Sequence, residues 1–179
     1  GRVGGALIHN AVVNPEHEAA RLYNFGVVHR RSGKLAEAIE AYCQAQLLTP
    51  DDPELLNNLG VALQEDGRPG ESVSLLERAA QLAPTLVAAH VNLGNALRST
   101  GQRTHAVESY HRAIALDGAS AVAHYNLFAA LHDDDPLAAE EALERAAALR
   151  PAHEMTRFQL EATRGWRLER EQLSESLPS

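Results

Sequence analysis

A short group of residues recurs along this chain at intervals of 34 residues. Asparagine, followed each time by a large apolar residue, stands at Asn24, Asn58, Asn92 and Asn126. Glycine comes next in three units, at Gly26, Gly60 and Gly94, whereas Phe128 takes its place in the fourth. A fixed period of this length over four units indicates a repeat architecture, in which each unit is one supersecondary motif stacked on its neighbours.

The second half of each unit keeps the same phase. Small residues stand at Ala38, Ser72, Ala106 and Ala139, larger ones at Tyr42, Leu76, Tyr110 and Leu143, and alanines at Ala45, Ala79, Ala113 and Ala146. Small residues, here and at the three glycines that follow the asparagine, allow two antiparallel helices to approach closely, and the larger residue fills the space between them. This pattern predicts first helices at 16–31, 52–65, 86–99 and 120–132, and second helices at 35–48, 69–82, 103–116 and 136–149.

Turn residues separate the predicted helices. Gly33, Gly67 and Gly101 stand where a first helix would end in a left-handed conformation. The second helices close at Pro50, Pro84, Gly118 and Pro151, and a proline cannot continue a helix. In the fourth unit the spacing shortens to 33 residues, and the turn Asp133–Pro136 marks where one residue is missing.

These residues resemble the tetratricopeptide repeat (TPR). The match covers residues 16–151, and about eight signature positions recur in phase. The family's first aromatic position holds Leu22, Leu56, His90 and His124 instead. The resemblance implies an all-α, right-handed superhelical solenoid with repeats at about 16–50, 51–84, 85–118 and 119–151. A plain helical bundle is the alternative, although a bundle would need no fixed period.

The two ends of the chain carry weaker patterns. Residues 1–15 read either as a leader or as the remnant of a preceding repeat, with Val3, Leu7 and Val13 on its apolar face. Residues 152–173 are predicted to form a C-terminal capping helix, because solenoid ends need covering. Its expected apolar face is Met155, Phe158, Ala162 and Trp166, although Trp166 could instead anchor a partner. Residues 174–179 are expected to form a disordered tail.

Composition excludes several classes of function. Hydrophobic residues make up 45% of the chain, which argues against disorder, and the net charge of −8 comes without a basic stripe, so we expect no nucleic-acid partner. No run of roughly 18 apolar residues occurs, so we expect no membrane insertion. Cys43 is alone and allows neither an intrachain disulfide nor a cysteine-based zinc site. A reducing, cytoplasmic compartment is therefore the simplest expectation.

The histidines lack the spacing of a metal site. Two ligands on one helical face stand four residues apart, unlike the pairs His105 with His111 and His124 with His132. His90 and His124 occupy equivalent repeat positions, and we expect both to pack between helices. We therefore predict no metal and no cofactor.

No motif for catalysis is found in the sequence. A phosphate-binding loop, a Gly-x-Ser-x-Gly turn and a His-Glu-x-x-His helix are all missing. We predict a non-catalytic protein–protein interaction scaffold. Two alternatives remain open: the chain could be the substrate-recognition part of a larger enzyme such as a glycosyltransferase, or a structural module that self-assembles through its repeat ends or convex face.

The TPR resemblance also implies where a partner would lie. In that family the first helices line a concave groove that holds extended peptides or helices. The corresponding candidates are Tyr23, Asn24, Arg30, Asn57, Asn58, Asn92, Asn95, Arg98, Tyr125 and Asn126. An amide both donates and accepts hydrogen bonds, so the four phased asparagines could bind a peptide backbone as a ladder. This ladder is similar to the one in the repeats of O-linked N-acetylglucosamine transferase; the alternative is that the asparagines only satisfy neighbouring polar groups.

One TPR subgroup binds the acidic tails of heat-shock chaperones through a clamp of Lys, Asn and Arg. The matching positions here are Tyr23, Val27, Asn58, Ala88 and Asn92, of which only Asn58 agrees. Without the basic members a carboxylate would meet little positive charge, so we do not expect chaperone-tail binding. Arg30, Arg31 and Arg98 could contact an acidic peptide, or they could be solvated at helix ends.

Overall fold

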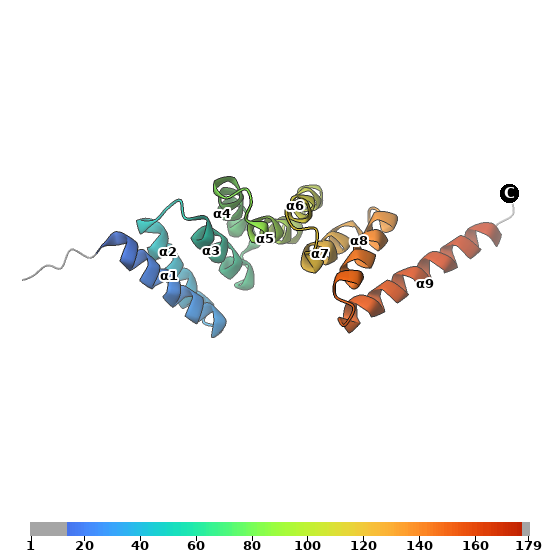
Figure 1. Cartoon of the computed structure of the whole chain (residues 1–179), viewed down its shortest axis with the longest axis horizontal. Coiled ribbons are helices and arrows are strands. Elements are labelled where there is room, and N and C mark those ends of the chain that lie inside the picture. Colours follow the sequence, from blue (N-terminus) through green and yellow to red (C-terminus); the bar gives the residue numbers. More distant parts are fainter. Residues whose placement is uncertain (1–13, 177–179) are drawn as a thin grey trace, which may run out of the picture.

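The structure is a computed structural model that describes residues 14–176, apart from the side chains of 166, 169–171 and 173–176. Over this range the chain forms nine helices and no strand (Figure 1). They are α1 (Pro15–Arg31), α2 (Leu35–Leu48), α3 (Pro53–Glu65), α4 (Pro69–Leu82), α5 (Val87–Ser99), α6 (Arg103–Leu116), α7 (Ala121–Leu131), α8 (Pro136–Leu149) and α9 (Glu154–Ser176). The eight helices predicted from the repeats are confirmed, and every boundary lies within one residue of the predicted one.

Two sets of glycines give each helical pair its shape. Gly33, Gly67 and Gly101 follow the ends of their helices with φ of 73°, 77° and 80°, a region that side chains with a Cβ disfavour. Gly26 lies where a Cβ would come within 2.5 Å of the Tyr42 ring, so glycine is what lets α1 and α2 approach this closely. Both glycine roles were predicted from the period.

The helical pairs stack in order along the chain. Each helix packs against the next one, and the hydrophobic core is divided into clusters that follow one another along the stack instead of gathering at one centre. We call α1, α3, α5 and α7 the A helices and α2, α4, α6 and α8 the B helices. Each A helix also touches the next A helix, whereas the described B helices have no comparable contact with one another.

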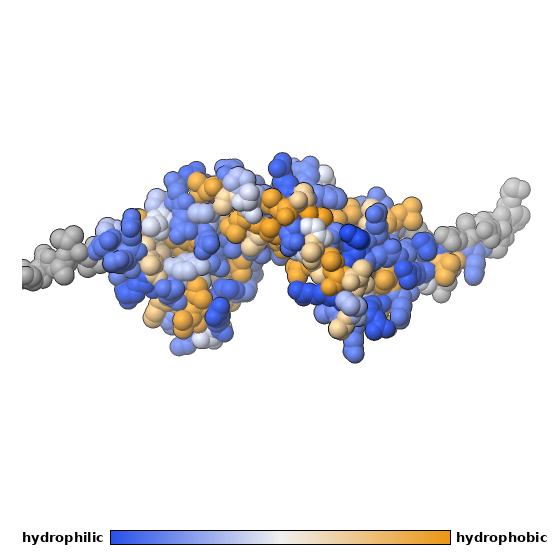
Figure 2. Space-filling model, viewed as in Figure 1, coloured by the Kyte–Doolittle hydropathy of each residue, from blue (hydrophilic) through white to orange (hydrophobic). Residues whose placement is uncertain are grey.

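This difference in contact curves the stack, with the A helices on the inner side. Figure 2 shows the molecule hollowed between α3 and α7, on the side away from α4 and α6. Hydrophobic and hydrophilic residues alternate over the surface in that view. The fold is thus the predicted all-α solenoid.

The fourth pair departs from the pattern of the other three. Phe128 stands where the others have glycine, is buried, and packs against Tyr125 with ring centroids 6.0 Å apart. Helix α7 ends at Leu131, and the turn Asp133–Asp135 replaces the left-handed glycine. The Asp135 side chain then accepts a hydrogen bond from the Ala138 backbone N–H at 3.1 Å, which caps α8.

Helix α9 packs on the last repeat, but through a different face from the predicted one. Met155 and Phe158 are 62% and 67% exposed, so the expectation that they cover the repeat end was wrong. Thr156 is buried instead, and Leu160 packs against the core. The Trp166 side chain lies outside the described residues.

Ion pairs complete the contact between α9 and α8. Glu140 is buried, and its carboxylate lies 3.2 Å from Arg167 and 3.7 Å from Arg164. Arg164 also reaches Glu144 at 2.5 Å. Helix α9 runs to Ser176 and so includes residues 174–176, which we expected in a disordered tail. Residues 1–13, the predicted leader or repeat remnant, lie outside the described part.

Candidate functional site

The four phased asparagines lie on the inner side of the A helices, one on each. We call Asn24, Asn58, Asn92 and Asn126 the asparagine file. Asn24 is exposed, and the other three are partly buried. The contact lines between successive A helices, which we call seams, pass beside these three side chains.

A hydrogen bond from the file bridges each seam. The side-chain N–H of Asn58 donates to the Tyr23 hydroxyl at 2.7 Å. Asn92 donates to the side-chain oxygen of Asn57 at 2.9 Å, and Asn126 donates to that of Asn95 at 3.0 Å. Six of the predicted groove residues are therefore brought together in pairs.

These bonds leave the oxygens of the file open. No side-chain oxygen of Asn58, Asn92 or Asn126 accepts a hydrogen bond within the described part of the chain, and Asn24 has no partner there. An amide oxygen can accept from the backbone N–H of a bound segment. The N–H groups of Asn58, Asn92 and Asn126 thus bridge the seams, while their side-chain oxygens make no hydrogen bond to a described residue.

Asn95 links three helices at one point. Its side-chain oxygen accepts from Asn126 and also from the hydroxyl of the fully buried Tyr110 on α6, at 2.8 Å. Burial raises the pKa of Tyr110, and the guanidinium of Arg98 opposes that rise. Burial likewise raises the pKa of Tyr23, with the charges of Glu54 and Asp52 adding to the effect.

The remaining predicted groove residues have mixed surroundings. Arg30 forms an ion pair across the first seam with Glu65 at 2.8 Å. Asn57 is buried, and its side-chain oxygen accepts the hydrogen bond from Asn92. Arg98 is exposed, and Tyr125 is partly buried against the core.

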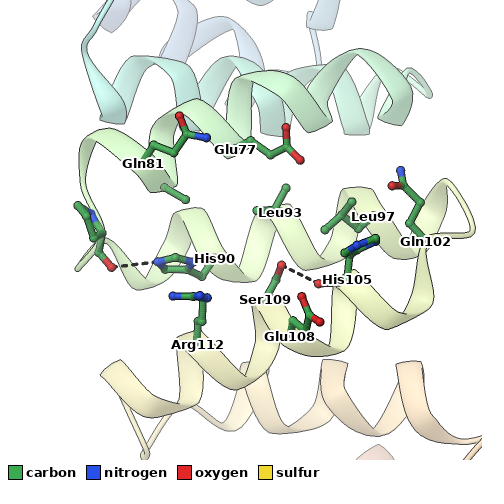
Figure 3. Close-up of a pocket in the computed structure, with 12 residues that line it drawn as sticks. Glu77, Gln81, His90, Leu93, Leu97, Gln102, His105, Glu108, Ser109 and Arg112 are labelled. Atoms are coloured by element: carbon green, nitrogen blue, oxygen red, sulfur yellow. Dashed lines mark hydrogen bonds between the residues drawn. The ribbon is translucent and has the colours of Figure 1, made fainter.

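The outer side of the solenoid carries a cavity of about 580 Å³ between α4 and α6, floored by α5 (Figure 3). Its lining includes the charged side chains of Glu77, Glu108 and Arg112 and the imidazoles of His90 and His105. Its buried polar groups are paired within the chain: His90 Nε2 lies 2.9 Å from the Pro84 carbonyl, and Ser109 donates to the His105 carbonyl. This cavity therefore presents charges of both signs to solvent.

The pairing of His90 also explains the residue's place in the repeat. His124, its equivalent, is buried too and lies 3.2 Å from the Gly118 carbonyl. Each imidazole thus bonds the loop that enters its own helix, which confirms that both histidines pack between helices. Among the described residues, no group of three or more His, Cys, Asp or Glu side chains is placed to hold a metal ion. No described helix is both long and apolar enough to span a bilayer.

Comparison with protein families matches the repeats directly. Three models, all of tetratricopeptide repeats, match residues 26–67, 54–83 and 89–122, which together make up more than half of the chain. The chain belongs to the tetratricopeptide repeat family. No curated protein matches the TPR chain at the sequence level.

Solved structures share the TPR fold over most of the chain. MamA from Desulfovibrio magneticus RS-1 aligns with a TM-score of 0.77 and 23% identity over 88% of this chain and 90% of that one. YrrB, described as a TPR protein with an unusual peptide-binding site, aligns with 0.72 and 22% over 80% and 74%. An O-GlcNAc transferase mutant from Thermobaculum terrenum gives 0.70 and 30% over 75% of this chain but only 26% of its own length.

Proposed function

We propose that this TPR chain is a protein-interaction scaffold that holds an extended segment of a partner in the concave groove lined by the A helices. The observation that supports the proposal is the asparagine file, whose side-chain oxygens accept no hydrogen bond from any described residue and lie beside the seams of the A helices. Extended backbone presents N–H groups at regular intervals, and a ladder of acceptors can bind it without reading its side chains. The similarity to YrrB supports the same class of function, since YrrB is a TPR protein with a peptide-binding site.

Two substitutions separate binding from stability. Asn92→Ala removes both the hydrogen bond to Asn57 and the amide oxygen that the proposal assigns to the ligand. Asn57→Ala removes the same hydrogen bond but keeps the Asn92 amide, so it is the matched control. Because one hydrogen bond contributes about 1 kcal/mol, we expect Asn92→Ala to weaken peptide binding by about 3- to 10-fold relative to Asn57→Ala.

The probe is a set of peptides selected on the folded full chain from a random display library. Dissociation constants are measured by fluorescence anisotropy for both variants and for Asn24→Ala, whose side chain has no partner within the described residues. Equal affinity in Asn92→Ala and Asn57→Ala, with no change in Asn24→Ala, would mean that the file only stabilises the solenoid.

A second candidate function is substrate selection within a larger enzyme. It is favoured by the 30% identity to the O-GlcNAc transferase, of which the aligned repeats make up only a part. The test is the reading frame around the gene segment that encodes this chain. A transferase domain in the same frame would support this function, and a frame without a catalytic domain would remove it.

Self-association is the third candidate. Helix α1, the first of the stack, leaves Phe25 and Val28 exposed, whereas their repeat equivalents Leu59 and Ala62 are buried. A second copy could cover this apolar end. Light scattering over a range of concentrations tests it: a dimer that Phe25→Ser disrupts would support the candidate, and a monomer at every concentration would rule it out.

A further inference from the structure

Helix α9 continues the phase of the A helices. Thr156, Gln159 and Leu160 each follow their α7 equivalents, Ala123, Asn126 and Leu127, by 33 residues. Thr156 is buried as Ala123 is, and Leu160 packs against the core cluster that includes Leu127. The first turns of α9 therefore stand where a fifth A helix would stand, with Gln159 at the position of the asparagine file.

The seam between α7 and α9 is open, in that no hydrogen bond between described side chains bridges it as one does each of the three before it. Two cavities of about 350 and 340 Å³ lie along it, and Tyr125 lines both. Gln159 makes no bridge to α7, and its side-chain oxygen is buried without a hydrogen-bond partner in the described part of the chain. Where asparagine closes the other seams, this one keeps space and an unused acceptor.

Apolar side chains border this open seam on the inner side. Val122 and Met155 line one cavity and are both exposed to solvent. Phe158 lies one turn beyond Met155 and one turn before Ala162, which lines the other cavity, so helical spacing places it on the same face. Exposed apolar residues gathered in this way mark an interaction surface.

A positive charge stands at the edge of the same surface. Arg150 and His153 line the same cavity as Met155, and Arg150 has no ion pair within the described residues. The His153 ring lies 2.7 Å from the Thr156 hydroxyl and so is already engaged at the start of α9. Arg150 is therefore the group available to a carboxylate on a ligand.

We propose that α9 extends the concave groove, and that the α7–α9 seam binds a bulky apolar side chain of the partner segment with a neighbouring carboxylate on Arg150. This inference rests on the proposed peptide-binding function and adds the chemistry of the bound segment. The shared inner face and the continuous phase of α7 and α9 join the seam to the groove. Large apolar side chains that enter such cavities carry much of the binding energy of an interface.

The test uses peptides selected on the full chain from the random display library. The variant Met155→Ser with Phe158→Ser removes the apolar border, and Leu47→Ser with Leu137→Ser removes two even more exposed apolar side chains on α2 and α8. All four side chains are exposed, so thermal unfolding should stay unchanged. We expect the first variant to bind the selected peptides about 10-fold more weakly and the control to bind them normally.

The sequences of the selected peptides give a second readout. They should share a Leu, Ile, Met or aromatic residue next to Asp or Glu, and Arg150→Gln should weaken binding only when the acidic residue is present. If Asn92→Ala weakens binding but the Met155 and Phe158 variant does not, the groove stands and this inference fails. If neither variant weakens binding beyond its control, or if no peptide is enriched, the proposed function itself fails.

Discussion

Replacing Asn95 with alanine should destabilise the solenoid more than replacing any residue of the asparagine file. The Asn95 oxygen accepts two hydrogen bonds, from Tyr110 at 2.8 Å and from Asn126 at 3.0 Å. Alanine removes both. Since Tyr110 is fully buried, its hydroxyl then loses the acceptor that it has in the described part of the chain.

The size of the effect follows from the burial of the two donors. An unsatisfied buried hydroxyl costs about 1–3 kcal/mol, and the partly buried Asn126 amide, which water can reach, loses about 0.5–1 kcal/mol. Alanine regains about 0.5 kcal/mol of helix propensity over asparagine. We therefore expect Asn95→Ala to lower the free energy of unfolding by about 2 kcal/mol.

The measurement is urea unfolding followed by circular dichroism. Asn24→Ala is the matched control, because Asn24 is an exposed asparagine on an A helix with no partner in the described residues, and its loss should leave stability unchanged or slightly raised. The double variant Asn95→Ala with Asn126→Ala should lose less than the sum of the single losses. If Asn95→Ala were as stable as Asn24→Ala, the bridging role of Asn95 would be refuted.

Three further predictions concern packing, pH and the last helix. Gly94→Ala places a Cβ against the buried Tyr110 ring and should lower the free energy of unfolding by about 1–2 kcal/mol after the gain in helix propensity. Gly165→Ala is the control in thermal unfolding, because open space surrounds Gly165 and the change should be neutral or stabilising. Burial raises the pKa of Tyr110 above its unfolded value of about 10. Its contribution to stability is therefore complete below that unfolded value and is lost as the pH rises through the folded pKa. In urea titrations from neutral to strongly alkaline pH, Tyr110→Phe should show a smaller loss of unfolding free energy than the unaltered chain. Glu140→Gln removes the charge that faces Arg164 and Arg167 and should speed hydrogen exchange in α9 but not in α1; unchanged exchange in α9 would contradict that role.

The helices could be predicted from the sequence because their ends are set locally. Gly33 and its equivalents end a helix through their own backbone conformation, and prolines begin or prevent one. The close approach at Gly26 follows from the absence of a side chain and needs no knowledge of distant contacts. A period read along the sequence was therefore sufficient for the solenoid.

The seams could not be predicted in the same way. Which atom of Asn92 meets Asn57 depends on the angle between successive repeats, and that angle results from the packing of many side chains. The face of α9 was predicted wrongly for a related reason. Met155 and Phe158 are apolar, which suggested burial, but their phase is that of Val122 and Tyr125 on the inner side of α7. Extending the period one unit further would have indicated this.

The central claim is that the inner face of the solenoid binds an extended peptide. The most direct measurement is a nuclear magnetic resonance titration of the full chain, labelled with ¹⁵N, with a peptide selected from the display library. We predict that side-chain amide signals of the asparagine file shift, together with backbone signals of α3, α5 and α7 and the first turns of α9. Shifts confined to α4 and α6, around the outer cavity with Glu77, His105 and Arg112, would contradict the account.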